Sequence, residues 1–114
     1  MTEISADDPF FLQLCGDLSD SEIVEVRQYL EEWAAGSYTS AAHSAIDHAL
    51  RKGIHPLRYL RKAHNFSRRG AKRVPKSGYR ADGSAVYRKG SEYLIVRLDS
   101  SGVERIVTYG LNDD

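Results

Sequence analysis

Apolar side chains in the first third of the chain recur at helical spacing. They are separated by three, four and three residues, at Ile23, Val26, Leu30 and Trp33. This stripe predicts a helix over residues 19–35, with Trp33 on its buried side. Ser19 and Glu22 have the spacing of a capping box, which favours a helix start at Ser19. The preceding apolar residues 9–12 are expected to pack against the core.

A second helical unit follows, in two parts joined by a tight turn. The pattern predicts one helix over residues 40–52 and another over residues 56–64. Gly53 suits the position just after a helix, and Pro56 suits the first position of the next. The second helix is amphipathic and basic. Leu57 and Leu60 lie on its apolar side, and its other sides carry Arg58, Arg61 and Lys62.

From Gly78 onward the period changes from helical to two, which is typical of strands. The predicted strands cover residues 79–80, 85–88, 93–98 and 105–109, in an antiparallel meander. The preceding residues 67–77 are basic and contain Gly70 and Pro75, so we expect an exposed loop or a short edge strand. In the third strand, Leu94 and Val96 share one face and Arg97 lies on the other. For the last strand, the alternation does not settle which side faces inward.

These elements predict an α+β fold in which N-terminal helices pack on a twisted, three- or four-stranded antiparallel sheet. The length of 114 residues fits one domain, with an acidic helical segment over residues 1–38 and a second segment over residues 39–114. One core is expected to contain Trp33, Leu50, Leu60, Leu94 and Val96.

The net charge of zero conceals a strong asymmetry. Residues 1–50 hold ten acids and one base, a balance of −9, whereas residues 51–114 hold fifteen bases and six acids, a balance of +9. Between Arg51 and Lys89 only Asp82 opposes thirteen bases. Such segregation favours a surface that binds a polyanion. The alternative is that the two halves neutralise each other in the folded protein.

Several classes of protein are excluded by what the sequence lacks. No window approaches the roughly 18 apolar residues of a membrane span, and residues 1–11 lack the features of a signal peptide, so no membrane partner is expected. Cys15 is the single cysteine, so no internal disulfide can form. No metal-ligand spacing, Gly-rich phosphate loop or Gly-x-Ser-x-Gly motif is present. We therefore predict neither a metal nor a cofactor.

The remaining residues suit metal-independent cleavage of RNA, in which the ribose 2′-OH attacks the neighbouring phosphorus. This reaction needs a base, a proton donor for the leaving oxygen, and cations or hydroxyls around the phosphorane. Histidine suits the first two roles because its ordinary pKa of about 6.5 lies near working pH. The candidates are His43 and His48 on a helix, Lys52 one turn later, and three residues on the sheet, Arg97, Arg105 and Thr108.

A family resemblance is carried by residues 43–110. The order of features is His48-x-x-x-Lys52-Gly53, a Tyr-Leu-x-x-Ala helix, a basic stretch, and a meander that ends with Thr108-Tyr109. This order resembles the small ribonuclease toxin domains of the barnase, EndoU, colicin D and RelE-like group. The resemblance implies an endoribonuclease toxin, with tRNA as one candidate substrate, that acts in the cytoplasm of a target cell. It also implies an RNA cleft on the sheet and a cognate immunity protein or antitoxin.

Within this hypothesis, His48 is the first choice for the general acid or base, and His43 is the reserve. Lys52, Thr108 and Arg97 are expected to contact the transferring phosphate. If no histidine is needed, Lys, Arg and Thr groups would act alone, as the RelE-like branch of the resemblance implies. A different class of function stays open: a non-catalytic module that binds nucleic acid or an acidic protein. The residues expected to bind RNA are Arg51, Arg58, Arg61, Lys62, Arg68, Arg69, Lys72, Arg73, Lys76, Arg105 and Tyr109.

Overall fold

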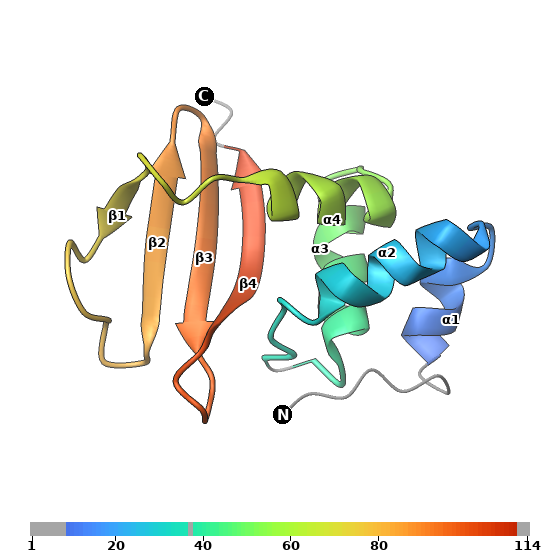
Figure 1. Cartoon of the computed structure of the whole chain (residues 1–114), viewed down its shortest axis with the longest axis horizontal. Coiled ribbons are helices and arrows are strands. Elements are labelled where there is room, and N and C mark those ends of the chain that lie inside the picture. Colours follow the sequence, from blue (N-terminus) through green and yellow to red (C-terminus); the bar gives the residue numbers. More distant parts are fainter. Residues whose placement is uncertain (1–8, 37, 112–114) are drawn as a thin grey trace.

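The computed structural model describes residues 9–36 and 38–111, so the beginning of the acidic segment, before Pro9, lies outside the described residues. Four helices come first: α1 (Pro9–Cys15), α2 (Asp20–Leu30), α3 (Ala41–Arg51) and α4 (Pro56–Asn65). Four strands follow: β1 (Lys72–Val74), β2 (Ser84–Lys89), β3 (Glu92–Leu98) and β4 (Glu104–Leu111). The strands form one antiparallel sheet in the order β1-β2-β3-β4. The predicted α+β class is therefore confirmed, with the helices gathered on the β4 side of the sheet (Figure 1).

Helix α2 begins as the sequence predicts and ends earlier. The Ser19 hydroxyl accepts from the backbone N–H of Glu22, and the Glu22 carboxylate accepts from the N–H of Ser19. The helix ends at Leu30 rather than near residue 35, because the chain then extends along the edge of β4. There the N–H of Ile106 donates to the carbonyl of Glu32, and its carbonyl accepts from Ala34. This pairing satisfies backbone groups that a longer helix would have used internally.

The turn between α3 and α4 has the predicted chemistry. Gly53 has a φ of +67°, which favours glycine after the end of α3. The His55 ring accepts from the N–H of Leu57 and so caps α4, whose first residue is Pro56. Leu50, predicted to be in the core, is 63% exposed. That prediction was wrong because α3 buries a stripe of small side chains that ends at Ala49, and the next residue points away from it.

The sheet differs from the prediction at its first strand. Residues 79–80 do not form a strand. They belong to the connection between β1 and β2, where the Arg73 guanidinium donates to the carbonyls of Pro75 and Gly78 and holds the chain in a loop. The alternative of an edge strand within residues 67–77 is confirmed by β1.

A bulge in β4 decides which of its residues face the core. Ile95 pairs with Thr108, but Val96 pairs with Ile106, so Val107 is an extra residue in β4. As a result Ile106 and Tyr109, which have opposite parity in sequence, are both buried. This shift explains why simple alternation could not settle the orientation of the strand.

The two faces of the sheet have different surroundings. The inner face, next to the helices, contributes these residues to the core: Ala85, Leu94, Val96, Ile106 and Tyr109. Trp33, Leu60 and Phe66 join them from the helical side. A linker, residues 66–71, leaves α4 and crosses the sheet to β1 (Figure 1). The outer face carries Lys72, Val74, Val86, Arg88, Tyr93, Ile95 and Arg97.

Tyr59 joins α4 to β4. Its side chain is fully buried, and its hydroxyl donates to the carbonyl of Tyr109 at 2.8 Å and accepts from the N–H of the same residue at 2.9 Å. Burial raises the pKa of Tyr59 to about 12, so the hydroxyl keeps its proton at neutral pH. A helix side chain thus takes the place of a neighbouring strand at this edge position.

Candidate functional site

A carboxylate with several donors lies near the start of β4. Glu104 is on the inner face, two residues before the buried Ile106, and its carboxylate is partly exposed. Tyr79 donates its hydroxyl to this carboxylate at 2.5 Å, and Tyr87 donates at 3.1 Å. Arg68, from the linker, places Nε 3.6 Å from the same carboxylate. We call this group, with Arg73, the Glu104 cluster.

Arg73 holds the two tyrosines of the cluster in place. It is the cross-strand partner of Tyr87 and donates from Nε to the Tyr87 hydroxyl at 3.3 Å. Its guanidinium carbon lies 4.8 Å from the ring centroid of Tyr79, within the range of a cation–π contact. The Tyr87 hydrogen bond raises the pKa of Arg73, and the Glu104 hydrogen bond raises the pKa of Tyr79. Tyr79 is therefore protonated, and Arg73 charged, at neutral pH.

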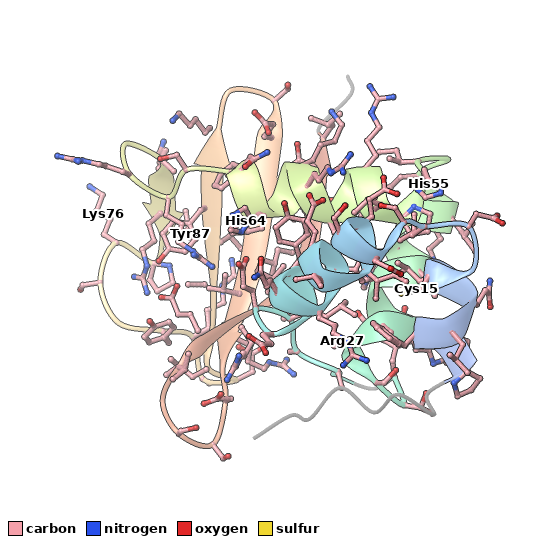
Figure 2. The ribbon with its side chains drawn as sticks, turned by 45° about the vertical axis from the view of Figure 1, so that its right-hand side comes forward. Cys15, Arg27, His55, His64, Lys76 and Tyr87 are labelled. Atoms are coloured by element: carbon pink, nitrogen blue, oxygen red, sulfur yellow. The ribbon has the colours of Figure 1, made fainter. Side chains whose placement is uncertain are left out.

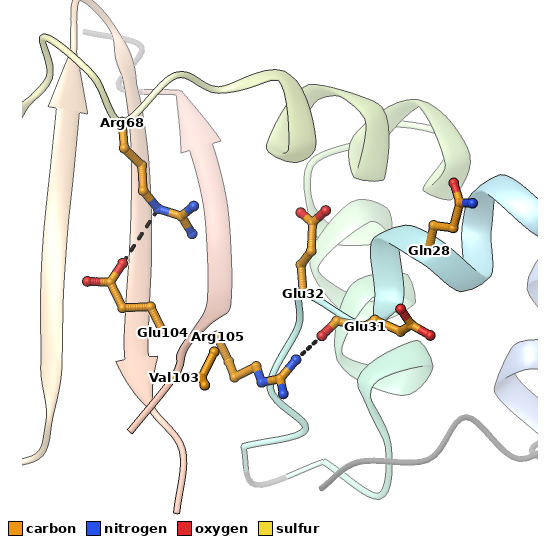
Figure 3. A pocket seen from close by; sticks show the side chains of 7 residues that line it. All are labelled: Gln28, Glu31, Glu32, Arg68, Val103, Glu104 and Arg105. Carbon is orange, nitrogen blue, oxygen red and sulfur yellow. Dashed lines mark hydrogen bonds and ion pairs between the residues drawn. The ribbon is translucent and has the colours of Figure 1, made fainter. Parts of the chain in front are cut away.

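The Glu104 cluster borders a hollow of about 370 Å³ between the sheet and the end of α2. Figure 3 shows Arg68 and Glu104 on the sheet side and acidic residues of the α2 end opposite them. The hollow is lined by Gln28, Glu31, Glu32, Arg68, Val103, Glu104 and Arg105. Acidic and basic groups therefore face each other across an open space.

A histidine stands beside this hollow. The Nδ1 of His64, in the last turn of α4, lies 2.7 Å from the carboxylate of Glu32, which lines the hollow. The ring centroid of Tyr29 lies 4.6 Å from that of His64. His64 belongs to α4 and Tyr87 to β2, and both are labelled in Figure 2. The site thus combines an imidazole and a carboxylate with fixed cations.

The helical half of the protein, α1 to α4, neutralises much of its own charge. Arg61 of α4 makes a two-pronged contact with Glu25 of α2, at 2.8 and 3.0 Å. Arg61 first, and then Tyr29, lower the pKa of Glu25 to about 2. The sheet half is different. Among described acids, none forms an ion pair with Arg69, Lys72, Arg73, Lys76, Arg80, Arg88 or Lys89. Ion pairs between the acidic residues 1–50 and the basic residues 51–114 therefore leave β1, β2 and their connections basic.

The predicted histidines of α3 lie on either side of one aromatic ring. His43 stacks on Phe10 at 3.8 Å, and His48 lies near Trp33 at 6.4 Å. Tyr38 contacts both rings edge-on, at 4.9 Å from His43 and 5.6 Å from His48. His48 donates from Nδ1 to the Ser44 carbonyl at 2.8 Å, and burial lowers the pKa of its ring. At neutral pH His48 is therefore a neutral imidazole.

The other predicted phosphate contacts are not brought together. Lys52 is the C-cap residue of α3 and lines a small hollow that Tyr109 also lines. Thr108 lies 3.2 Å from the Tyr59 hydroxyl and donates to it, because that hydroxyl gives its own proton to Tyr109. Arg97 projects from the outer face and pairs with Asp82 at 3.3 Å. Among the described contacts, Lys52, Arg97 and Thr108 thus have separate partners, and none joins the three into the cleft that the resemblance implies.

The residues predicted to bind RNA separate into three groups. Arg68, Arg73 and Arg105 lie at the Glu104 cluster or its hollow. Two others are held by acids of the helical half, since Arg61 pairs with Glu25 and Arg51 pairs with Asp47. No described acid pairs with Arg58, Lys62, Arg69, Lys72 or Lys76.

Tyr109 is a correction to the prediction. The residue is 2% exposed, so it belongs to the core and its ring is not available to an RNA base. Its hydroxyl donates to Glu92 at 2.6 Å. The alternation left the inward side of this strand open, and the resemblance placed Tyr109 at the site. The pairing of Tyr109 with Leu94, after the bulge, turns it inward.

Sequence reasoning also missed Glu104, Tyr79 and Tyr87 as site residues. Tyr79 and Tyr87 are eight positions apart, and Glu104 is seventeen positions beyond Tyr87. Only the pairing of β2, β3 and β4 brings them together. The signal that could have indicated them is a single acid on a strand face otherwise composed of apolar and aromatic side chains.

Two further findings concern other kinds of site. In residues 9–36 and 38–111 no three His, Cys, Asp or Glu side chains are grouped closely enough to hold a metal ion. The helices in the same residues are all too short or too polar to cross a membrane.

Comparison with family models, with curated proteins and with solved structures found no match to this chain.

Proposed function

We propose that the protein is a metal-independent endoribonuclease, and that Glu104 is its general base. The observation that carries this proposal is the Glu104 cluster, a partly exposed carboxylate that borders an open hollow with arginines around it. Cleavage by the ribose 2′-OH needs these groups, a base for the hydroxyl proton and cations for the phosphate. The basic surface of β1 and β2 adds the electrostatic attraction that an RNA substrate requires.

The proposed reaction is a transfer of phosphorus from one ribose oxygen to another. Glu104 takes the proton of the 2′-OH, the 2′-oxygen forms a bond to phosphorus, and the bond from phosphorus to the 5′-oxygen breaks. His64 is the proton donor for the leaving 5′-oxygen. Arg68 and Arg105, which line the same hollow, face the phosphate oxygens. The products are a 2′,3′-cyclic phosphate and a free 5′-hydroxyl.

The roles of the tyrosines and of Arg73 are to position the base. Two phenol hydroxyls fix the Glu104 carboxylate, and Arg73 in turn fixes Tyr87. A carboxylate held by several hydrogen bonds loses little orientational freedom when substrate binds, which favours a productive geometry.

His48 remains the alternative acid or base, as the sequence indicates. Its neutral ring donates from Nδ1, so Nε2 carries the lone pair that could accept a proton. The two centres are on different elements, Glu104 on β4 and His48 on α3. Single substitutions therefore distinguish them.

The test measures cleavage of total tRNA by purified, folded variants. We expect Glu104→Gln to reduce the rate by about 100- to 10,000-fold, the usual loss on removing an acid or base. The matched control is Glu92→Gln, because Glu92 is also a sheet carboxylate that accepts a tyrosine hydroxyl, at 2.6 Å from Tyr109. This control should cleave at the wild-type rate.

Three results would contradict the proposal in different ways. If Glu104→Gln retains the wild-type rate and His48→Ala does not, the catalytic centre is on α3. If both variants retain activity, neither residue is the base. If the wild-type chain binds RNA and cleaves none, the protein is a non-catalytic binding module.

We further propose that the protein is a toxin with an acidic immunity protein or antitoxin that covers the basic region. The unneutralised bases of β1 and β2 support an acidic partner. Expression without that partner should slow bacterial growth, and Glu104→Gln should restore it. Equal growth with wild type and with the variant, at equal protein levels, would contradict the toxin hypothesis.

A further inference from the structure

The outer face of the sheet is a second charged surface, separate from the Glu104 cluster. Strand pairing places Lys72, Arg88, Tyr93 and Gly110 in one row across the four strands. Lys72 and Arg88 are exposed, and Tyr93 is half-buried. Neighbouring strands are about 4.8 Å apart, so the three side chains form a continuous row about 10 Å long.

The positive charges of this row are not neutralised by any described acid. Lys72 and Arg88 make no ion pair with any described acid. Cross-strand pairs of like charge destabilise a sheet, so the stability of the fold does not account for this pair. On the same face Arg97 reaches Asp82, but both side chains are about half-exposed and their contact is at 3.3 Å. Such a surface attracts a polyanion.

The row ends at an aromatic ring that lies on the sheet. A Cβ added at Gly110 would stand 2.5 Å from Cζ of Tyr93, so the glycine leaves the space that the ring occupies. The ring therefore packs against backbone on one side, and its half-buried state leaves another part in contact with solvent. Aromatic rings at the end of a basic surface are typical platforms for stacking a nucleic-acid base.

We propose that the outer face binds single-stranded RNA, with phosphates on Lys72 and Arg88 and a base on Tyr93. The identity of the polymer rests on the proposed function, since an endoribonuclease must hold RNA on both sides of the cleaved bond. A row of cations that ends in an aromatic ring fits this occupant better than a protein, whose interfaces place apolar residues at the centre and charges at the rim.

The test uses a fluorescent dodecamer of 2′-O-methyluridine, which has no free 2′-OH and cannot be cleaved by the proposed reaction. Fluorescence anisotropy gives its affinity at several salt concentrations. Each phosphate contact on a single strand contributes about 0.7 to the slope of log K against log salt. The double variant Lys72→Ala/Arg88→Ala should therefore reduce that slope by about 1.4. Tyr93→Ala should weaken binding by roughly 5- to 100-fold at constant slope.

The matched control removes the same number of cations from the helical half. Arg58 and Lys62 of α4 likewise make no ion pair with a described acid. Arg58→Ala/Lys62→Ala should lower the slope and the affinity by clearly less than Lys72→Ala/Arg88→Ala does. Equal losses in the two double variants would show diffuse attraction to a basic protein and would overturn the proposal. All variants are first shown to melt cooperatively, and the Lys72/Arg88 result decides if Tyr93→Ala does not fold.

Two further outcomes also decide the matter. If polyglutamate binds more tightly than the dodecamer and its binding is lost in Lys72→Ala/Arg88→Ala, the surface serves an acidic protein and the RNA proposal is wrong. If the wild type binds the dodecamer and cleaves no RNA, the proposed function alone is rejected. If the wild type cleaves RNA and the outer-face variants bind the dodecamer as tightly as the wild type, this inference alone is rejected.

Discussion

The substitution Tyr59→Phe removes one oxygen atom at the contact between α4 and β4. In the wild type this hydroxyl makes hydrogen bonds to both the N–H and the carbonyl of Tyr109, at 2.9 and 2.8 Å. Thr108 adds a third contact at 3.2 Å. The side chain is fully buried, so water does not replace the missing partner without a rearrangement of the contact.

The expected cost follows from the groups that lose their partner. A buried donor or acceptor left unsatisfied costs about 1–3 kcal/mol, and Tyr59→Phe leaves one of each on Tyr109. Because the two groups are adjacent and can relax together, we expect a total loss of about 2–4 kcal/mol in the free energy of unfolding. For a chain of this length that corresponds to a decrease in Tm of roughly 10–15 °C.

The assay is chemical denaturation by urea, followed by circular dichroism, with thermal melts as a second measurement. The control is Tyr29→Phe, which also removes one phenol oxygen but loses a single, part-buried hydrogen bond to Glu25. This control should lose less than Tyr59→Phe, about 1 kcal/mol, because the Glu25 carboxylate keeps both hydrogen bonds from Arg61. If Tyr59→Phe is as stable as Tyr29→Phe, the Tyr59 hydroxyl does not replace a strand at the β4 edge, and our account of how the helices join the sheet is wrong.

Two further predictions concern pH and packing. Because the pKa of Glu25 is lowered to about 2, its contact with Arg61 stabilises the protein fully above the ordinary pKa of 4.5 and is lost as the pH falls from 4.5 to about 2. The stability difference between wild type and Glu25→Gln should therefore be about 1 kcal/mol at pH 6 and disappear near pH 2, a small value because Arg61 is 45% exposed; a difference independent of pH would contradict it. Gly110→Ala should destabilise by about 1–3 kcal/mol, because the new Cβ would stand 2.5 Å from Tyr93. Combining it with Tyr93→Leu should recover part of the loss, and simple additivity of the two costs in urea denaturation would refute the proposed clash.

The sequence by itself determined the local structure of the helical half. Capping at Ser19, the Gly53 turn and the Pro56 start depend on groups a few residues apart, so their chemistry can be read along the chain. It also determined the class of the fold, because periods of 3.6 and 2 select helix and strand. Leu50 shows the limit of this reasoning: an apolar residue at a suitable spacing is exposed where the buried stripe consists mainly of alanines.

Only the tertiary structure decided which residues form the candidate site. The β4 bulge turns both Ile106 and Tyr109 inward, and strand pairing joins Tyr79, Tyr87 and Glu104 across intervals that carry no periodic signal. The charge asymmetry was visible in the sequence, but the division between neutralised and free bases was not. That division depends on α2 lying beside α4, where Glu25 meets Arg61, while no described acid forms an ion pair with a base of β1 or β2. Long-range contacts of this sort follow from packing, which brings together residues that the sequence keeps far apart.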